Sequence, residues 1–334
     1  MKWDRAHGEI AGFLPPSYTM IVHERPSGLT LFLILRGSVL QRIRWKLSLN
    51  ILLAVLVTLA HGYLFDIKIT VTTIPFTLIG LPLAIFLGFR NNTAYDRYWE
   101  GRKLWGDINI RVRVLARQCL SLIRLDQPLD PNNREGDVRV RVIHRALAHA
   151  HALRAQLRHH MDDRAVERWL TRDDWDKVRN LPMDYRGDAI IQANANDLAQ
   201  CVRDGQIDSI SYNKMDETLT FITFAAASCE RLRYTPIPFS YTLLLHRTAH
   251  LYCFLLPFGL VDVTGFMTPF VVGIVAYTFF GLDALGDELE EPFGTDNNDL
   301  PLDAMCRTME RNALHLLGDT DIPPPMQPVD SRLT

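Results

Sequence analysis

The chain has 334 residues, of which 48% are hydrophobic and 22% charged, and its formal net charge is −2. A net charge so close to zero argues against nucleic-acid binding, which needs a basic surface. The hydrophobic residues are concentrated in four segments of nearly bilayer length, so we expect an all-α membrane protein. The alternative is a soluble all-helical protein that buries these segments, but four such stretches are hard to bury in a chain of this length.

The N-terminal region, 1–46, is expected to be a cytoplasmic arm that ends in an amphipathic helix. Its first twelve residues are polar and show no hydrophobic signal with a cleavage site, so membrane segments should act as internal signals. In 31–46 apolar and basic residues alternate, which fits a helix at the lipid headgroups or one packed on protein. The five cysteines form no CxxC pair or disulfide framework, as is typical of a reducing interior.

Two transmembrane helices are predicted within 47–90. The first covers 47–65, long enough to cross about 30 Å of hydrocarbon. The second begins at Ile74 and stays free of charge until Arg90, where the sequence turns charged and aromatic. This abrupt change is expected of a helix that leaves a bilayer into water. Pro82 lies in mid-span and should bend the helix.

A cytoplasmic helical region is predicted for 91–237. The composition of 126–136 indicates a loop, and 161–205 is polar with short helical runs. A long helix is expected over 208–233, with Asp208 or Ser209 as its capping residue.

The segment 137–160 reads as a helix rich in arginine and histidine. No two of its histidines are spaced i, i+4, so a zinc pair on one face is not expected: His144, His149, His151, His159 and His160. His144 and His151 share a face, which is a candidate pH sensor. We favour the alternative, a solvated basic face, because charge runs usually are solvated.

Two further transmembrane helices are predicted within 238–286, over 239–261 and 266–285. Arg247 lies in the first of them. Because a charged side chain facing lipid is costly, we expect Arg247 to point into the protein and to be paired.

The C-terminal part is predicted to contain a cytoplasmic helix region, 287–318, and a disordered tail, 319–334. The tail is proline-rich and the region before it ends in an amphipathic segment at about 300–317. The acidic run 287–291 and the loop after it suit cation binding through carboxylates and carbonyls, although their order is not that of an EF-hand. A plain helix end followed by a loop is the alternative.

The distribution of basic residues predicts the orientation. Arginine and lysine cluster before the first span, after the second and before the third, whereas the short connections 66–73 and 262–265 contain only Lys68. The positive-inside rule then places both termini and the region 90–237 in the cytoplasm. We therefore expect a multi-pass protein of the cell (inner) membrane.

Leu81, Ile85 and Phe89 recur every fourth residue and should form one narrow stripe of the second helix. Small residues at 80, 84 and 88 lie beside them and permit close helix approach. The stripe is either a packing seam or one wall of a pore that gates by dewetting, and spacing alone does not decide between them. Signatures of enzymes are absent: the sequence has no phosphate loop, dinucleotide-binding glycines, HExxH or nucleophile elbow.

Several short sequence segments, in order along about residues 35–317, together resemble one family: IPFTL, IFLGFRN, DRYWEGRKLWG, CERLRYTPIPFSYT and ELEEPFGTDNNDLPLDAMC. The chain resembles the bestrophins in their bacterial form. The resemblance implies a homopentameric ion channel around a central pore, passing small monovalent ions, chloride by family resemblance. It also favours the pore reading of the stripe, with Leu81, Ile85 and Phe89 at a hydrophobic neck that acts as the gate, and it puts Ile210 at a cytoplasmic aperture.

The sequence departs from the animal members of that family in two ways. They have aromatic residues at more than one neck level, whereas here only Phe89 is aromatic, so support for anions is weaker and monovalent cations such as sodium are the alternative. They also carry an unbroken acidic run that helps to bind Ca²⁺. Here Asp296 and Asp299 remain at matching positions, and fewer charges predict weaker binding or none, so no cofactor is required.

The expected partners are membrane lipid, identical subunits and monovalent ions, with no nucleic acid. A rival of another class is a non-conducting membrane scaffold, in which the apolar stripe only packs subunits together. A secondary transporter is less favoured because the chain shows no pair of matching halves.

Overall fold

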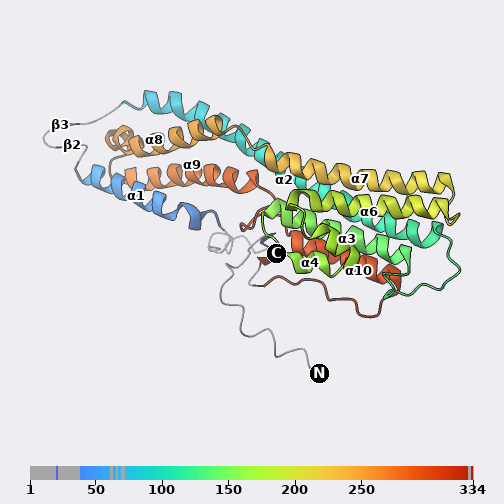
Figure 1. Ribbon diagram of the computed structural model, residues 1–334. Helices are drawn as coiled ribbons and strands as arrows, with labels where there is room; N and C mark the ends of the chain where they lie inside the picture. Colours follow the sequence, from blue (N-terminus) through green and yellow to red (C-terminus); the bar gives the residue numbers. More distant parts are fainter. Residues whose placement is uncertain are drawn as a thin grey trace, which may run out of the picture. The chain divides into compact units, whose positions relative to one another are not determined.

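The computed structural model describes residues 20–21, 38–60, 63–64, 67–68, 72–329 and 332–333 (Figure 1). Most of the predicted N-terminal arm and of the first connection lies outside these residues. The regular secondary structure of the described chain is helical except for two short antiparallel strand pairs. These are β1 (Met20–Ile21) with β4 (Arg332–Leu333), and β2 (Tyr63–Leu64) with β3 (Ile67–Lys68). The predicted all-α class is confirmed.

The chain forms two compact units. One, here called the helical body, comprises Met1–Val22, Gly101–Arg233 and Phe293–Thr334. The other, here called the apolar unit, comprises His23–Glu100 and Tyr234–Pro292. The predicted domain boundaries follow predicted spans rather than compact units, and they stay a prediction.

Four helices build the apolar unit: α1 (Leu40–Leu59), the first half of α2 (Ile74–Leu122), α8 (Phe239–Thr264) and α9 (Thr268–Glu290). A 3₁₀ turn, Gly265–Met267, joins the last two. α1 packs on both α8 and α9 (Figure 1). Their shared core is aliphatic and aromatic: Ile43, Leu83, Leu87, Leu245, Ala249, Cys253, Ala276, Phe279, Phe280 and Ala284.

The helix bounds follow the predictions with some shifts. α1 begins seven residues before the first predicted span (47–65) and ends at Leu59, and α2 begins at Ile74 as predicted. α2 is assigned as one helix through Pro82, which is exposed. The helices approach most closely at Gly259 of α8: a Cβ there would overlap the ring of Phe76 of α2, so glycine is required.

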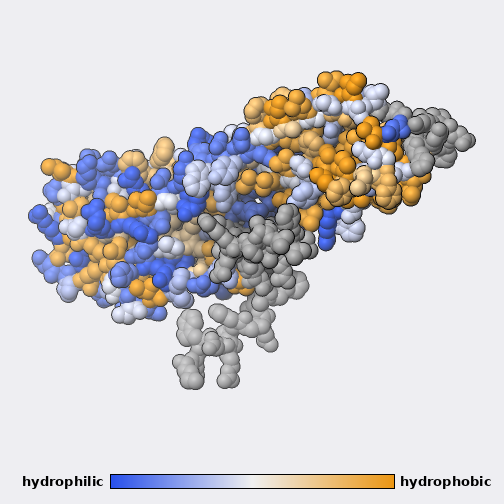
Figure 2. All heavy atoms as spheres, turned by 180° about the vertical axis from the view of Figure 1, so that it is seen from behind, coloured by the Kyte–Doolittle hydropathy of each residue, from blue (hydrophilic) through white to orange (hydrophobic). Residues whose placement is uncertain are grey.

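The surface of the apolar unit is hydrophobic. Among the described residues, Ile74–Leu122 and Phe239–Glu290 are long and apolar enough to cross a membrane, and only 22% of the residues in the apolar window of each are buried. A core helix of a soluble protein would be mostly buried instead. Figure 2 shows hydrophobic side chains gathered over this unit. Such an exterior fits lipid rather than water.

The helical body contains the second half of α2 and six helices: α3 (Val138–Arg158), α4 (Asp163–Glu167), α5 (Arg172–Val178), α6 (Met183–Arg203), α7 (Ser209–Tyr234, except its last residue) and α10 (Leu302–Leu317). α3 is its central helix and packs on α6, α10 and α4. The prediction of only short helical runs in 161–205 is wrong, since α6 alone has 21 residues. Asp208 caps α7 as predicted, accepting hydrogen bonds from the backbone of Ile210 and Ser211.

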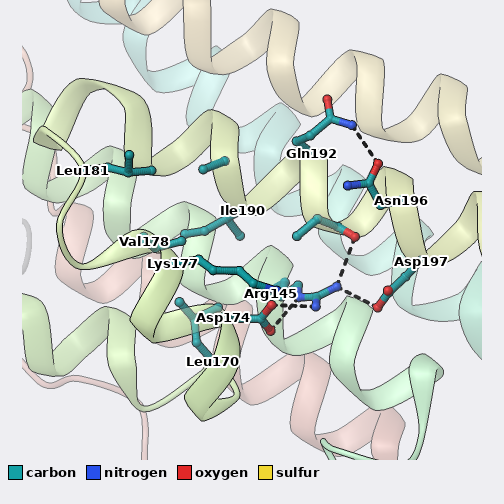
Figure 3. Close-up of a pocket in the computed structure, with 12 residues that line it drawn as sticks. Arg145, Leu170, Asp174, Lys177, Val178, Leu181, Ile190, Gln192, Asn196 and Asp197 are labelled. Atoms are coloured by element: carbon teal, nitrogen blue, oxygen red, sulfur yellow. Dashed lines mark hydrogen bonds and ion pairs between the residues drawn. The ribbon is translucent and has the colours of Figure 1, made fainter.

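The prediction that the histidine-rich helix presents a solvated basic face is wrong. Nearly every residue of α3 is buried, including its histidines at 144, 149 and 151. The reason is that carboxylates from the surrounding helices neutralise its arginines. Arg145 donates to Asp174 and Asp197, both at 2.7 Å (Figure 3). Arg158 donates to Asp303, also at 2.7 Å.

We expect Asp174→Ala to destabilise the helical body strongly. The change leaves Arg145 buried with one of its two carboxylates, and removing one partner of a buried pair typically costs about 3–5 kcal/mol. A thermal unfolding scan of the purified protein measures this as a large fall in Tm. Asp173→Ala, one residue away, removes only the exposed pair with Lys177 and should change Tm little. Equal effects of the two changes would contradict the buried-pair argument.

Candidate functional site

The three stripe residues of α2 lie on an exposed face. The exposed fractions of Leu81, Ile85 and Phe89 are 66%, 47% and 58%. The buried residues Leu83 and Leu87 are on the other side of the helix, because two residues along an α-helix correspond to about 160° around its axis. The stripe therefore lies outside the buried core of the described residues, although the ring of Phe89 lies edge-on to that of Phe86 in the same helix.

Arg90 marks the end of the uncharged part of α2 and is completely buried. Its guanidinium donates to Asp283 at 2.9 Å and to Asp287, and Glu290 lies 3.7 Å away. All three carboxylates belong to α9. They hold the exit of α2 against that helix, which fixes the rotation of α2 about its own axis.

Ile210 lies in the first turn of α7 and is 78% exposed. The cap made by Asp208 begins the helix at this point, and the side chain of Ile210 has no place in the core of the helical body. Its predicted role at an aperture stays a prediction.

Asp296 and Asp299 lie in the loop between α9 and α10. The backbone N–H of Asp296 donates to the Oδ2 of Asp299 at 2.7 Å, and Asp299 is buried whereas Asp296 is exposed. One carboxylate oxygen thus already closes the turn, which leaves fewer oxygens for Ca²⁺ than an open acidic run provides. Ca²⁺ binding here stays a prediction.

A pocket of about 380 Å³ in the helical body contains Arg145 (Figure 3). The guanidinium is engaged by Asp174 and Asp197 and by the carbonyl of Ala193 at 3.1 Å. Because those carboxylates neutralise the cation, the pocket does not resemble an anion site. We interpret its charges as structural.

Two features of the apolar unit were not anticipated from the sequence. The prediction that Arg247 is inward and paired is wrong within one chain, because its side chain is exposed and makes no ion pair with the described residues. His246, His250 and Asp283 form a cluster whose candidate ligand atoms lie within 4.8 Å of one another. The i, i+4 spacing of the two histidines on α8 is the sequence signal for this cluster.

The comparisons with known proteins agree on one family. A family model for bacterial and fungal bestrophin proteins matches residues 20–315. A voltage-dependent anion channel-forming protein of Mesorhizobium japonicum is 41% identical over 313 residues, which are 93% of this chain and 96% of that protein. The voltage-dependent anion channel-forming protein YneE of Escherichia coli K12 is 38% identical over 309 residues, with 92% and 98% coverage.

Solved structures agree with the sequence relatives. The crystal structure of a bacterial bestrophin homolog from Klebsiella pneumoniae matches with a TM-score of 0.75 and 38% identity, covering 83% of this chain and 99% of that one. The fold and the apolar exterior thus define a helical membrane channel protein rather than an enzyme. The chain belongs to the bestrophin family, as its sequence motifs predict.

His144 of α3 should make the stability of the helical body depend on pH. Its ring lies edge-on to Trp169, its nitrogens have no hydrogen-bond partner among the described residues, and burial, aided by Arg134, lowers its pKa from 6.5 to about 4. In the unfolded chain His144 binds a proton below about pH 6.5, whereas in the folded chain it binds one only below about pH 4. Stability present at pH 7 is therefore lost as the pH falls through this window, by about 3 kcal/mol for this group.

Tm measured from pH 7 to pH 4 should fall less steeply for His144→Phe, which keeps an aromatic ring against Trp169. His160→Phe, at an exposed position, is the control and should keep the wild-type slope. An unchanged slope in His144→Phe would contradict the assignment.

Proposed function

We propose that the protein is a homopentameric channel for small monovalent anions, with chloride as the expected ion. We further propose that Leu81, Ile85 and Phe89 form its hydrophobic gate. The observation that carries the proposal is their exposure on the face of α2 opposite its buried face. In a closed ring of identical subunits the same surface of each subunit faces the symmetry axis, and the exposed stripe of α2 can supply that surface. Five copies of an aliphatic stripe would there form a constriction that controls conduction by dewetting.

In this proposal α1, α2, α8 and α9 span the membrane. α1 has 20 residues and is about 30 Å long, matching the hydrocarbon thickness. Both termini and the helical body lie in the cytoplasm, following the positive-inside pattern, and the membrane is the inner one. Ile210 would contribute to a second, cytoplasmic aperture, supported by its exposure at the start of α7.

The sign of the permeant ion rests on two arguments that point in different directions. Relatives that align with this chain over most of its length are named anion channel-forming proteins, which supports an anion as the permeant ion. The proposed neck has one aromatic level, Phe89, whose ring edge suits an anion, whereas Leu81 and Ile85 offer no such edge. A pore for monovalent cations such as sodium is the second candidate, favoured by that departure.

The neck is tested by single-channel recording in planar bilayers. Replacing Leu81, Ile85 and Phe89 together by alanine should widen and wet the constriction, so open probability or conductance should rise at least several-fold. Ile79→Ala is the matched control. Ile79 and Ile85 are each 47% exposed, but they lie about 120° apart around α2, so the control should leave both quantities unchanged. Equal behaviour of the two variants would refute the neck.

The sign of the ion is tested by the reversal potential under a KCl gradient. An anion channel should reverse near the chloride equilibrium potential, and a cation channel near that of potassium. Purified protein that never dissipates an ion gradient in liposomes would instead indicate the non-conducting scaffold. Native mass spectrometry of the same sample should give five subunits, and any other number would refute the pentamer.

A further inference from the structure

We propose that His246, His250 and Asp283 form a binding site for a divalent transition-metal ion such as Zn²⁺ or Co²⁺. One candidate ligand atom from each of the three lies within 4.8 Å of the others. Two histidines and one carboxylate form a three-ligand set that is common for such ions and leaves a fourth position open. Neither the gate nor the acidic loop uses these residues.

The helices bring the three side chains together. His246 and His250 are one helical turn apart on α8, so their rings lie on the same face, with centroids 4.1 Å apart. Asp283 comes from α9 and its Oδ2 accepts a hydrogen bond from the Nδ1 of His246 at 2.7 Å. A bound ion would replace that proton and connect α8 to α9 directly.

The hydrogen bonding of His250 leaves one nitrogen available. Its Nδ1 lies 2.7 Å from the backbone carbonyl oxygen of His246, which can only accept, so Nδ1 carries the proton in the neutral ring. Nε2 then carries a lone pair, and this buried atom has no partner among the described residues. An N–H to carbonyl bond on the other nitrogen is the usual way in which a metal-binding histidine is oriented.

The charge around Asp283 also suits a cation. Its Oδ1 accepts from Arg90 at 2.9 Å, which by itself opposes a second positive charge. Asp287 and Glu290 contact the same guanidinium, so carboxylates outnumber it three to one. Lys46 on α1 is a further cation nearby, at the wall of the cavity that His250 also lines.

That cavity gives an ion access to His250, the one of the three proposed ligands that lines it. It has a volume of about 500 Å³ and is lined mostly by apolar side chains of α1, α8 and α9. Asn50 lines it too, and its Oδ1 is a second buried atom without a partner among the described residues. A water on the fourth position of the ion would supply a donor to such an oxygen. Ligands of one tetrahedral ion lie about 3.3 Å apart, so side-chain rotation must bring ligand atoms that now lie up to 4.8 Å apart closer by as much as about 1.5 Å.

The test is Co²⁺ binding to the purified full-length protein, followed by its visible d–d absorption and by calorimetry. Wild type should bind one Co²⁺ per subunit. His250→Phe, which keeps a ring beside Phe280, should weaken binding at least tenfold, whereas His315→Phe, at an exposed position of α10, should not change it.

X-ray absorption of the Zn²⁺-loaded wild type provides a second readout that does not depend on a folded variant. It should show two imidazoles and oxygen ligands, without sulfur. Less than one ion per subunit in wild type, equal affinity in wild type and His250→Phe, or a shell with one imidazole or none would each overturn the proposal. In any of these cases the cluster is only a hydrogen-bonded contact between helices.

Discussion

The completely buried guanidinium of Arg90 is the interaction on which the arrangement of the apolar unit depends. A buried cation is costly unless it is paired and hydrogen-bonded, and here three carboxylates of α9 surround it. The pairing fixes where α2 leaves the apolar unit and how the helix is rotated. Leu83 and Leu87 then pack inward, and the opposite face of α2 has no place in the subunit's own core.

The helical body uses the same principle. Its central helix, α3, carries arginines into the interior because α5, α6 and α10 supply carboxylates at matching places. Its buried histidines differ in their partners: His151 contacts the carboxylate of Glu310 and His149 the carbonyl of Gly187, whereas His144 has no hydrogen-bond partner among the described residues. Burial lowers the pKa values of all three. The helix thus holds paired charges and neutral rings at once, which keeps it stable near neutral pH and sensitive to acid.

Much of the fold was predictable because membrane helices have strong local signals. The start of α2 at Ile74, the cap of α7 at Asp208 and the amphipathic α10 all follow from composition and periodicity. The burial of α3 did not, because a sequence does not show which carboxylates reach a helix from distant segments. The partner of Arg90 was hidden for the same reason, being separated from it by 193 residues. The exposure of the stripe residues agrees with their predicted position on one face, but their place in an assembly depends on neighbouring subunits.

An exposed apolar stripe has two physical uses in a membrane protein, and the residues beyond Phe89 bear on both. A lipid-facing helix keeps its apolar surface to the headgroups and then usually meets aromatic or basic side chains. On α2 the exposed face continues past Phe89 with the polar residues Asn92, Thr93 and Asp96 and with the aromatic residues Tyr95 and Trp99. Lipid does not favour amide, hydroxyl and carboxylate groups directly below a hydrocarbon stripe, whereas water entering a pore below its narrowest level does. The polar residues of this face therefore suit an aqueous axis, and its two aromatic residues suit the level of the lipid headgroups.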